Sequence, residues 1–118
     1  MTRTELQETR PSLTRSCKAC GFSFYITVSF NADNPVEVFI TLSKQGSTLR
    51  GFCDTLGITI SIALQYGVPW GALYKKYMQQ TFDPYDDEYD SLVAAIANHI
   101  DEVIMAYRKD NDTISEAH

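Results

Sequence analysis

Apolar residues follow two different periods along this chain. In residues 22–30, apolar and polar side chains alternate, which is the pattern of a half-buried strand. Residues 36–42 repeat that alternation. The five residues between them, 31–35, read Asn-Ala-Asp-Asn-Pro and are typical of a turn. The first half of the chain therefore predicts two antiparallel strands joined as a hairpin.

The second half of the chain has the period of helices. Apolar residues recur at three- and four-residue steps through 49–64, with Ser47 or Thr48 as a candidate N-cap and Gly67 as a left-handed stop. This helix is apolar nearly all round, so it should be buried on two sides.

Two further helices are expected towards the C-terminus. A short amphipathic helix should begin at Trp70, after the break at Pro69, and a longer one should cover 92–107. The acidic segment 81–90 between them lacks the spacing of a calcium loop and is interpreted as a solvated loop. The order ββααα predicts an α+β fold, a small antiparallel hairpin covered by three helices and completed by oligomerisation.

The polar ends suggest three parts to the chain. Residues 1–20 are expected to be a flexible N-terminal arm that carries a Cys-x-x-Cys pair. A single α+β domain should occupy 21–109, and 110–118 should be a frayed tail.

Charge and composition exclude some functions. The net charge of −5 and the pI of about 4.8 argue against binding to long nucleic acids. No run reaches the ~18 apolar residues of a membrane span, and the first residues do not form a signal peptide. Three cysteines without a secretion signal favour a reducing, cytoplasmic setting.

Five blocks of sequence, taken together, carry a family resemblance. They are Tyr-Ile-Thr-Val at 25–28, Glu-Val-Phe-Ile at 37–40, Ser-Lys-Gln-Gly-Ser at 43–47, 61–69, and the start of the last predicted helix at 91–97. Their order and spacing resemble the C-terminal TSCPD-type domain of adenosylcobalamin-dependent (class II) ribonucleotide reductases. The resemblance spans roughly residues 20–100.

The chain departs from that family in ways that limit what carries over. Asp-Thr-Leu-Gly-Ile at 54–58 lacks a basic residue that the family tends to have, and Val93-Ala94 stands where the family has Pro-Asp. The reductase's catalytic barrel is absent, so the resemblance implies a small, non-catalytic accessory domain, here free-standing. Its expected partners include a ribonucleotide reductase chain.

A candidate phosphate site lies where the second strand meets the long helix. Helix N-termini present unpaired amides with partial positive charge, and Lys44 and Arg50 would add full charges. Gly46 would allow close approach of the backbone, while Ser47 and Thr48 offer hydroxyls. The alternative interpretation is an ordinary capped helix with solvated cations.

Aromatic residues would form the other half of a nucleotide site. Trp70 and Tyr74 are the first candidates for stacking on a base, with Tyr66, Phe39 and Tyr25 as further ones. Trp70 is expected to be exposed because it opens a helix after a proline. The alternative is that these rings belong to the core.

The cysteines offer a different kind of site. Cys17 and Cys20 have the spacing of half a zinc site, which two copies could complete across a dimer. They could also be a redox pair, or unliganded surface thiols. Cys53 should be a packed core thiol, and His99 should lie at a packing edge.

These observations predict a non-catalytic module that binds a small nucleotide or related phosphate and needs no cofactor. It is expected to form a homo-oligomer and to avoid membranes and long nucleic acids. If the protein is from a phage, it could act as a sponge that sequesters a signalling nucleotide. The alternatives are a protein-interaction subunit that docks on a ribonucleotide reductase, or a zinc or thiol module built on Cys17 and Cys20.

Overall fold

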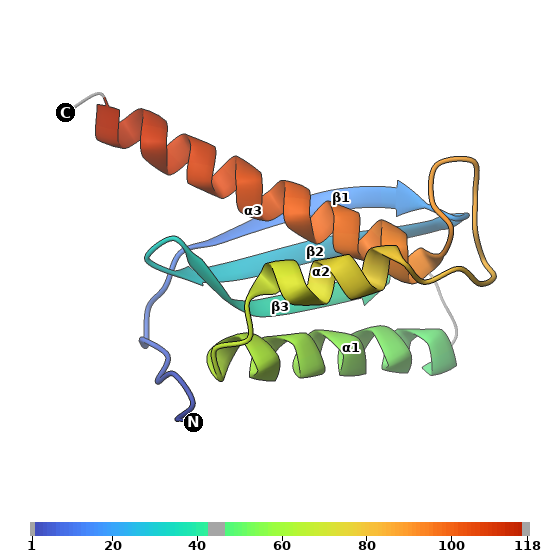
Figure 1. Ribbon diagram of the computed structural model, residues 1–118, viewed down its shortest axis with the longest axis horizontal. Coiled ribbons are helices and arrows are strands. Elements are labelled where there is room, and N and C mark those ends of the chain that lie inside the picture. The colour runs from blue at the N-terminus through green and yellow to red at the C-terminus, as the bar shows by residue number, and fades with distance from the viewer. Residues whose placement is uncertain (1, 43–46, 117–118) are drawn as a thin grey trace.

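The computed structural model describes residues 2–42 and 47–116 (Figure 1). It confirms the α+β fold, with three strands followed by three helices. The strands form one antiparallel sheet in the order β1-β2-β3. The elements are β1 (Ser12–Ala19), β2 (Phe22–Asn31), β3 (Asn34–Leu42), α1 (Ser47–Gln65), α2 (Trp70–Met78) and α3 (Leu92–Glu116).

Strand β1 corrects the expectation of a flexible arm over 1–20. It pairs with β2 along its whole length and joins it through a turn at Cys20 and Gly21, both of which have positive φ. Positive φ at both turn residues is the requirement of a two-residue type I′ hairpin. The strand escaped prediction because its inward positions are partly small or charged, including Arg15 and Ala19, so their hydrophobic alternation is weak.

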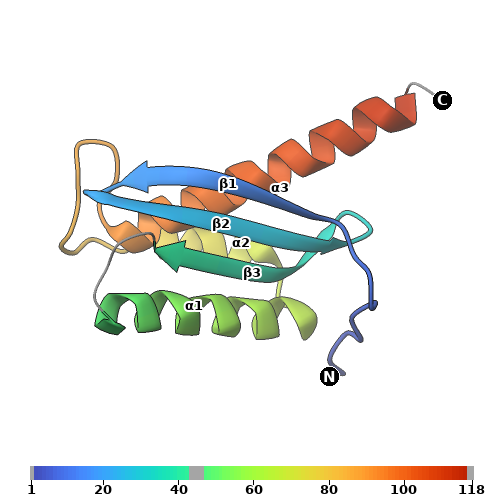
Figure 2. The same ribbon diagram turned by 180° about the vertical axis from the view of Figure 1, so that it is seen from behind.

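The β2–β3 hairpin is as predicted, and its register aligns the apolar faces of both strands. Val28 lies opposite Val38, and Ile26 lies opposite Ile40. These side chains are buried together with Phe24 beneath α3. Helix α3 crosses this face of the sheet and α2 packs on α3, while the opposite face carries no helix (Figures 1 and 2).

Helix α1 does not cover a face of the sheet; it runs along the edge strand β3 (Figure 2). The Ser61 hydroxyl accepts a hydrogen bond from the Val38 N–H (2.8 Å), and the Gln65 side chain donates one to the Val36 carbonyl (2.9 Å). The outward backbone groups of an edge strand otherwise invite pairing with another chain. Side chains of α1 therefore seal the β3 edge.

The last helix is longer than the predicted stripe over 92–107 and includes residues assigned to a frayed tail. Near its C-terminal end, Arg108 Nε donates to the Asp33 carbonyl and Asn111 Nδ2 donates to Asp33 Oδ1, both at 3.2 Å. These bonds tie the helix to the β2–β3 turn and explain its extension through that region. Among the described residues, no helix has both the length and the apolarity to cross a membrane.

Candidate functional site

The uncovered face of the sheet combines hydroxyl groups with two half-exposed aromatic rings. Because strand side chains alternate, burying one apolar face sends Thr27, Tyr25, Phe39 and Thr41 to the other. Thr27 lies opposite Phe39, and Tyr25 lies opposite Thr41. Phe39 is 50% exposed and Tyr25 is 48% exposed. We call this surface the open face.

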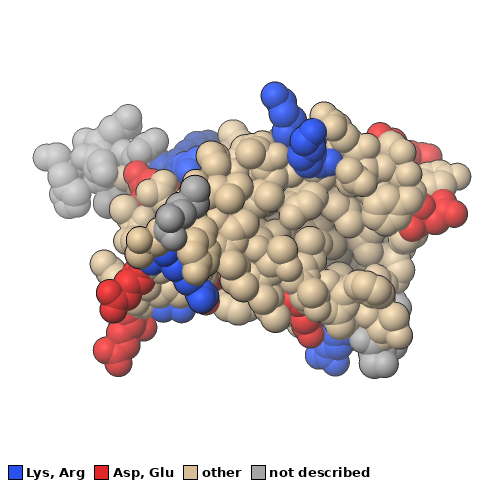
Figure 3. Space-filling view, turned by 60° about the horizontal axis from the view of Figure 1, so that its bottom comes forward, with Lys and Arg blue, Asp and Glu red and all other residues tan. Residues whose placement is uncertain are grey.

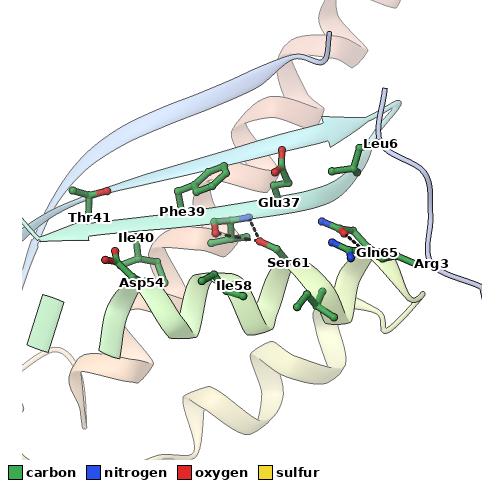
Figure 4. Close-up of a pocket in the computed structure, with 12 residues that line it drawn as sticks. Arg3, Leu6, Glu37, Phe39, Ile40, Thr41, Asp54, Ile58, Ser61 and Gln65 are labelled. Atoms are coloured by element: carbon green, nitrogen blue, oxygen red, sulfur yellow. Dashed lines mark hydrogen bonds between the residues drawn. The ribbon is translucent and has the colours of Figure 1, made fainter. Parts of the chain in front are cut away.

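A groove with a volume of about 270 Å³ lies between β3 and α1, beside Phe39 (Figure 4). Its apolar walls are formed by Phe39 from β3, by Ile58 and Ile62 from α1, and by Leu6 from the N-terminal segment. Ser61 lies at its floor, where the hydroxyl contacts the Val38 backbone. We call this hollow the edge groove.

The N-terminal segment closes one end of the edge groove. Arg3 Nε donates to Gln65 Oε1, and the Thr4 N–H donates to the Gln65 carbonyl, both at 2.6 Å. Gln65 is itself buried and bonded to β3. Residues 3–6 are thus attached to the end of α1 rather than loose.

Charges around the edge groove do not favour a phosphate. Arg3 and Glu37 line it near one end, and Glu37 forms an ion pair with Arg10 (2.5 Å). Asp54 adds a carboxylate from α1. Cations and carboxylates are balanced here, so an apolar group with a polar surround fits the groove better than an anion does.

The predicted phosphate site at the start of α1 is described only in part. Lys44 and Gly46 lie outside the described residues, and so does the side chain of Ser47. Thr48 and Arg50 are exposed in the first turn of α1, which contains no acidic residue. The phosphate site therefore stays a prediction.

The expectation of an exposed Trp70 is wrong. Trp70 is 8% exposed, and its indole Nε1 donates to Asp101 Oδ1 of α3 (3.1 Å). The proline break turns the chain so that α2 packs on α3, which buries the ring together with part of Tyr74. Stacking surfaces are offered by Phe39 and Tyr25 instead. Their positions could have been read from the sequence, because both occupy the polar side of an alternating strand.

Cys17 and Cys20 are not surface thiols, because both are buried. Burial raises the pKa of each thiol, and the nearby Asp86 carboxylate raises that of Cys20 further. A raised pKa disfavours the thiolate needed for metal binding or redox attack. Within residues 2–42 and 47–116, no cluster of three or more His, Cys, Asp or Glu side chains could hold a metal ion. Zinc at Cys17 and Cys20 stays a prediction that would require ligands from elsewhere.

One carboxylate of the acidic segment has a structural role. Asp86 accepts hydrogen bonds from the N–H groups of Cys20 (2.7 Å), Tyr89 (2.7 Å) and Glu88 (2.9 Å). These donors hold the pKa of Asp86 below its ordinary value. The segment 81–90 is thus fastened to the β1–β2 turn, which differs from the expectation of a wholly solvated loop.

The three-stranded sheet, the sealed β3 edge and the open face define a small α+β domain. Residues 2–104 match the TSCPD domain family, and the chain belongs to it.

The relatives are named vitamin B12-dependent ribonucleotide reductases. The chain is 41% identical over 83 residues to those of Rhodopirellula baltica and Streptomyces coelicolor, and 29% identical to that of Bradyrhizobium diazoefficiens. Each match covers 70% of this chain but only 8%, 9% and 7% of those relatives, respectively. No solved structure matches.

Proposed function

We propose that this chain is a non-catalytic binding module of the vitamin B12-dependent ribonucleotide reductase type, which docks a larger protein on its edge groove and open face. The observation that carries the proposal is Phe39, a large apolar side chain left half-exposed beside a preformed apolar groove. Large aromatic residues at the centre of an interface often dominate its binding energy.

The surroundings of Phe39 suit a protein partner. Ile58 and Ile62 extend the apolar surface, while Thr41 and Asp54 provide a polar margin. An apolar centre with a polar rim is the usual anatomy of a protein interface. The charged groups at the groove also lack the excess of cations that a phosphate ligand would favour.

A partner is suggested by the relatives, in which the matched segment is a small part of a chain named ribonucleotide reductase. The test uses the Streptomyces coelicolor reductase with its matched segment removed, immobilised for interferometry. We expect this chain to bind it, and Phe39→Ala to weaken binding by about 30-fold or more, the scale of an interface hot spot.

Phe82→Ala is the matched control for this experiment. Phe82 has nearly the same exposure as Phe39 (48% against 50%) but lies in the segment 81–90, away from the open face. It should bind as the unaltered chain does. Absence of binding by the unaltered chain, or equal losses in the two variants, would contradict the proposal.

Nucleotide binding at the start of α1 is the second candidate function. It is favoured by a first helical turn without acidic residues and by the exposed Arg50. In a phage-infected cell, such binding would sequester a signalling nucleotide.

Calorimetric titration with a panel of mono-, di- and cyclic nucleotides tests this second function. One nucleotide should release heat, and Arg50→Ala should reduce its affinity, whereas Lys75→Ala on the exposed side of α2 should leave it unchanged. If no member of the panel binds, or if Lys75→Ala weakens binding as much as Arg50→Ala, the nucleotide site is wrong.

A further inference from the structure

The solvent side of α1 carries a regular uncharged stripe. Its six residues are separated alternately by four and three positions, which is the spacing of a helix-packing seam. All six are exposed, and Phe52 is 69% exposed. We call this the outer stripe; it consists of Thr48, Phe52, Thr55, Thr59, Ile62 and Tyr66.

The charges of α1 lie off the outer stripe. Arg50 and Asp54 are the charged residues in this 19-residue helix. They are four positions apart and so share one side, where Asp54 lines the edge groove. In Figure 3, uncharged atoms cover the middle of the face, and Lys, Arg, Asp and Glu side chains lie towards its margins. A surface helix ordinarily presents charged residues to water, so this side is suited to burial.

We infer that the outer stripe binds the same stripe of a second copy, with the two α1 helices antiparallel. A two-fold axis that crosses the outer stripe midway between Thr55 and Thr59 places Thr55 opposite Thr59 of the second copy and Phe52 opposite Ile62. In the same register Tyr66 meets the small Thr48. The stripe therefore matches itself: small residues meet at the centre, and no bulky ring faces another bulky ring.

Three properties of the molecule favour this occupant. The chain carries a net charge of −5, so two copies approach each other with least repulsion along an uncharged surface. The hydroxyl of Thr59 already donates to the Thr55 carbonyl (2.9 Å), so its burial leaves no unpaired donor. Helix α1 is fixed to β3 through Ser61 and Gln65, which holds the stripe in position.

Sedimentation velocity over a wide range of chain concentrations tests the assembly. The unaltered chain should pass from monomer to dimer. Thr59→Glu and Phe52→Glu should each weaken the dimer by about 100-fold or more, because each would bury an unpaired carboxylate against an uncharged residue of the second copy. Thr41→Glu on the open face is the control and should dimerise normally. A chain that stays monomeric, or a dimer that all three variants leave intact, overturns the inference.

Cysteine pairing tests the direction of the helices. Thr55→Cys mixed with Thr59→Cys should form a disulfide between the two variants under mild oxidation, because a disulfide needs Cα atoms within about 7 Å. The unaltered chain, whose own cysteines are buried, is the control. Thr55→Cys chains that pair mainly with each other would indicate a parallel arrangement and overturn the proposed register. Because Phe39 lies off the stripe, Phe39→Ala should leave this dimer intact even if docking fails.

Discussion

At the scale of single residues, Asp86 shows how one exposed carboxylate can organise distant backbone. Its carboxylate accepts hydrogen bonds from N–H groups of the β1–β2 turn and of its own segment. These bonds favour the charged form and lower the pKa of Asp86. A carboxylate whose pKa is lower in the folded state stabilises the fold at pH values above its unfolded pKa. That contribution is lost as the pH falls through the folded pKa.

This linkage predicts a pH-dependent effect of Asp86→Asn. The variant keeps an acceptor but loses the charge, so it should melt at a lower temperature than the unaltered chain at pH 7. The difference should shrink as the pH falls from the ordinary Asp value of about 4 towards the lower folded pKa, where the unaltered carboxylate gains its proton. Thermal melts across this pH range measure it, with Asp87→Asn, at an exposed neighbour, as the control. An equal response in both variants would exclude the role of Asp86.

At the scale of elements, the contact between α1 and β3 depends on a glycine. A Cβ at Gly57 would lie 2.8 Å from the Val38 carbonyl oxygen, closer than two such atoms can approach. Gly57 therefore allows the helix to lie against the strand. Gly51, in the same helix, has open space around the position of a Cβ.

The two glycines predict opposite effects of the same substitution. Gly57→Ala should lower the free energy of unfolding by about 1–3 kcal/mol, because the helix must move away from the strand. Gly51→Ala should raise it by up to about 1 kcal/mol through helix propensity. Urea denaturation of both variants measures these changes. Equal stabilisation by the two substitutions would mean that α1 does not rest closely on β3.

Much of the element order could be predicted because the apolar periods are clear. Apolar and polar residues alternate in β2 and β3, and apolar residues recur every three or four positions in α1 and α3. Each pattern follows from burying one face of the element. Strand β1 was missed because Cys17 and Ala19 are weakly hydrophobic markers and Arg15 interrupts the pattern. The position of α1 beside the edge strand could not be predicted from the hydrophobic pattern either. It depends on hydrogen bonds from Ser61 and Gln65 to β3, and in the sequence these are ordinary polar residues.

At the scale of the whole molecule, the site could be predicted less well than the fold. The local sequence could suggest a candidate site at the start of α1. The edge groove, by contrast, forms only when the N-terminal segment, β3 and α1 come together. Trp70 was misplaced for the same reason, because its burial depends on the packing of α2 against α3. Surfaces built from distant segments leave little trace in any single stretch of sequence.

The attachment of Arg3 and Thr4 to Gln65 has a practical consequence for handling this protein. An affinity tag fused ahead of these residues would emerge at the mouth of the edge groove and could obstruct whatever binds there. Helix α3, by contrast, extends past the sheet at its C-terminal end (Figure 2). Purification handles and fluorescent labels therefore belong after α3, where they leave the groove accessible.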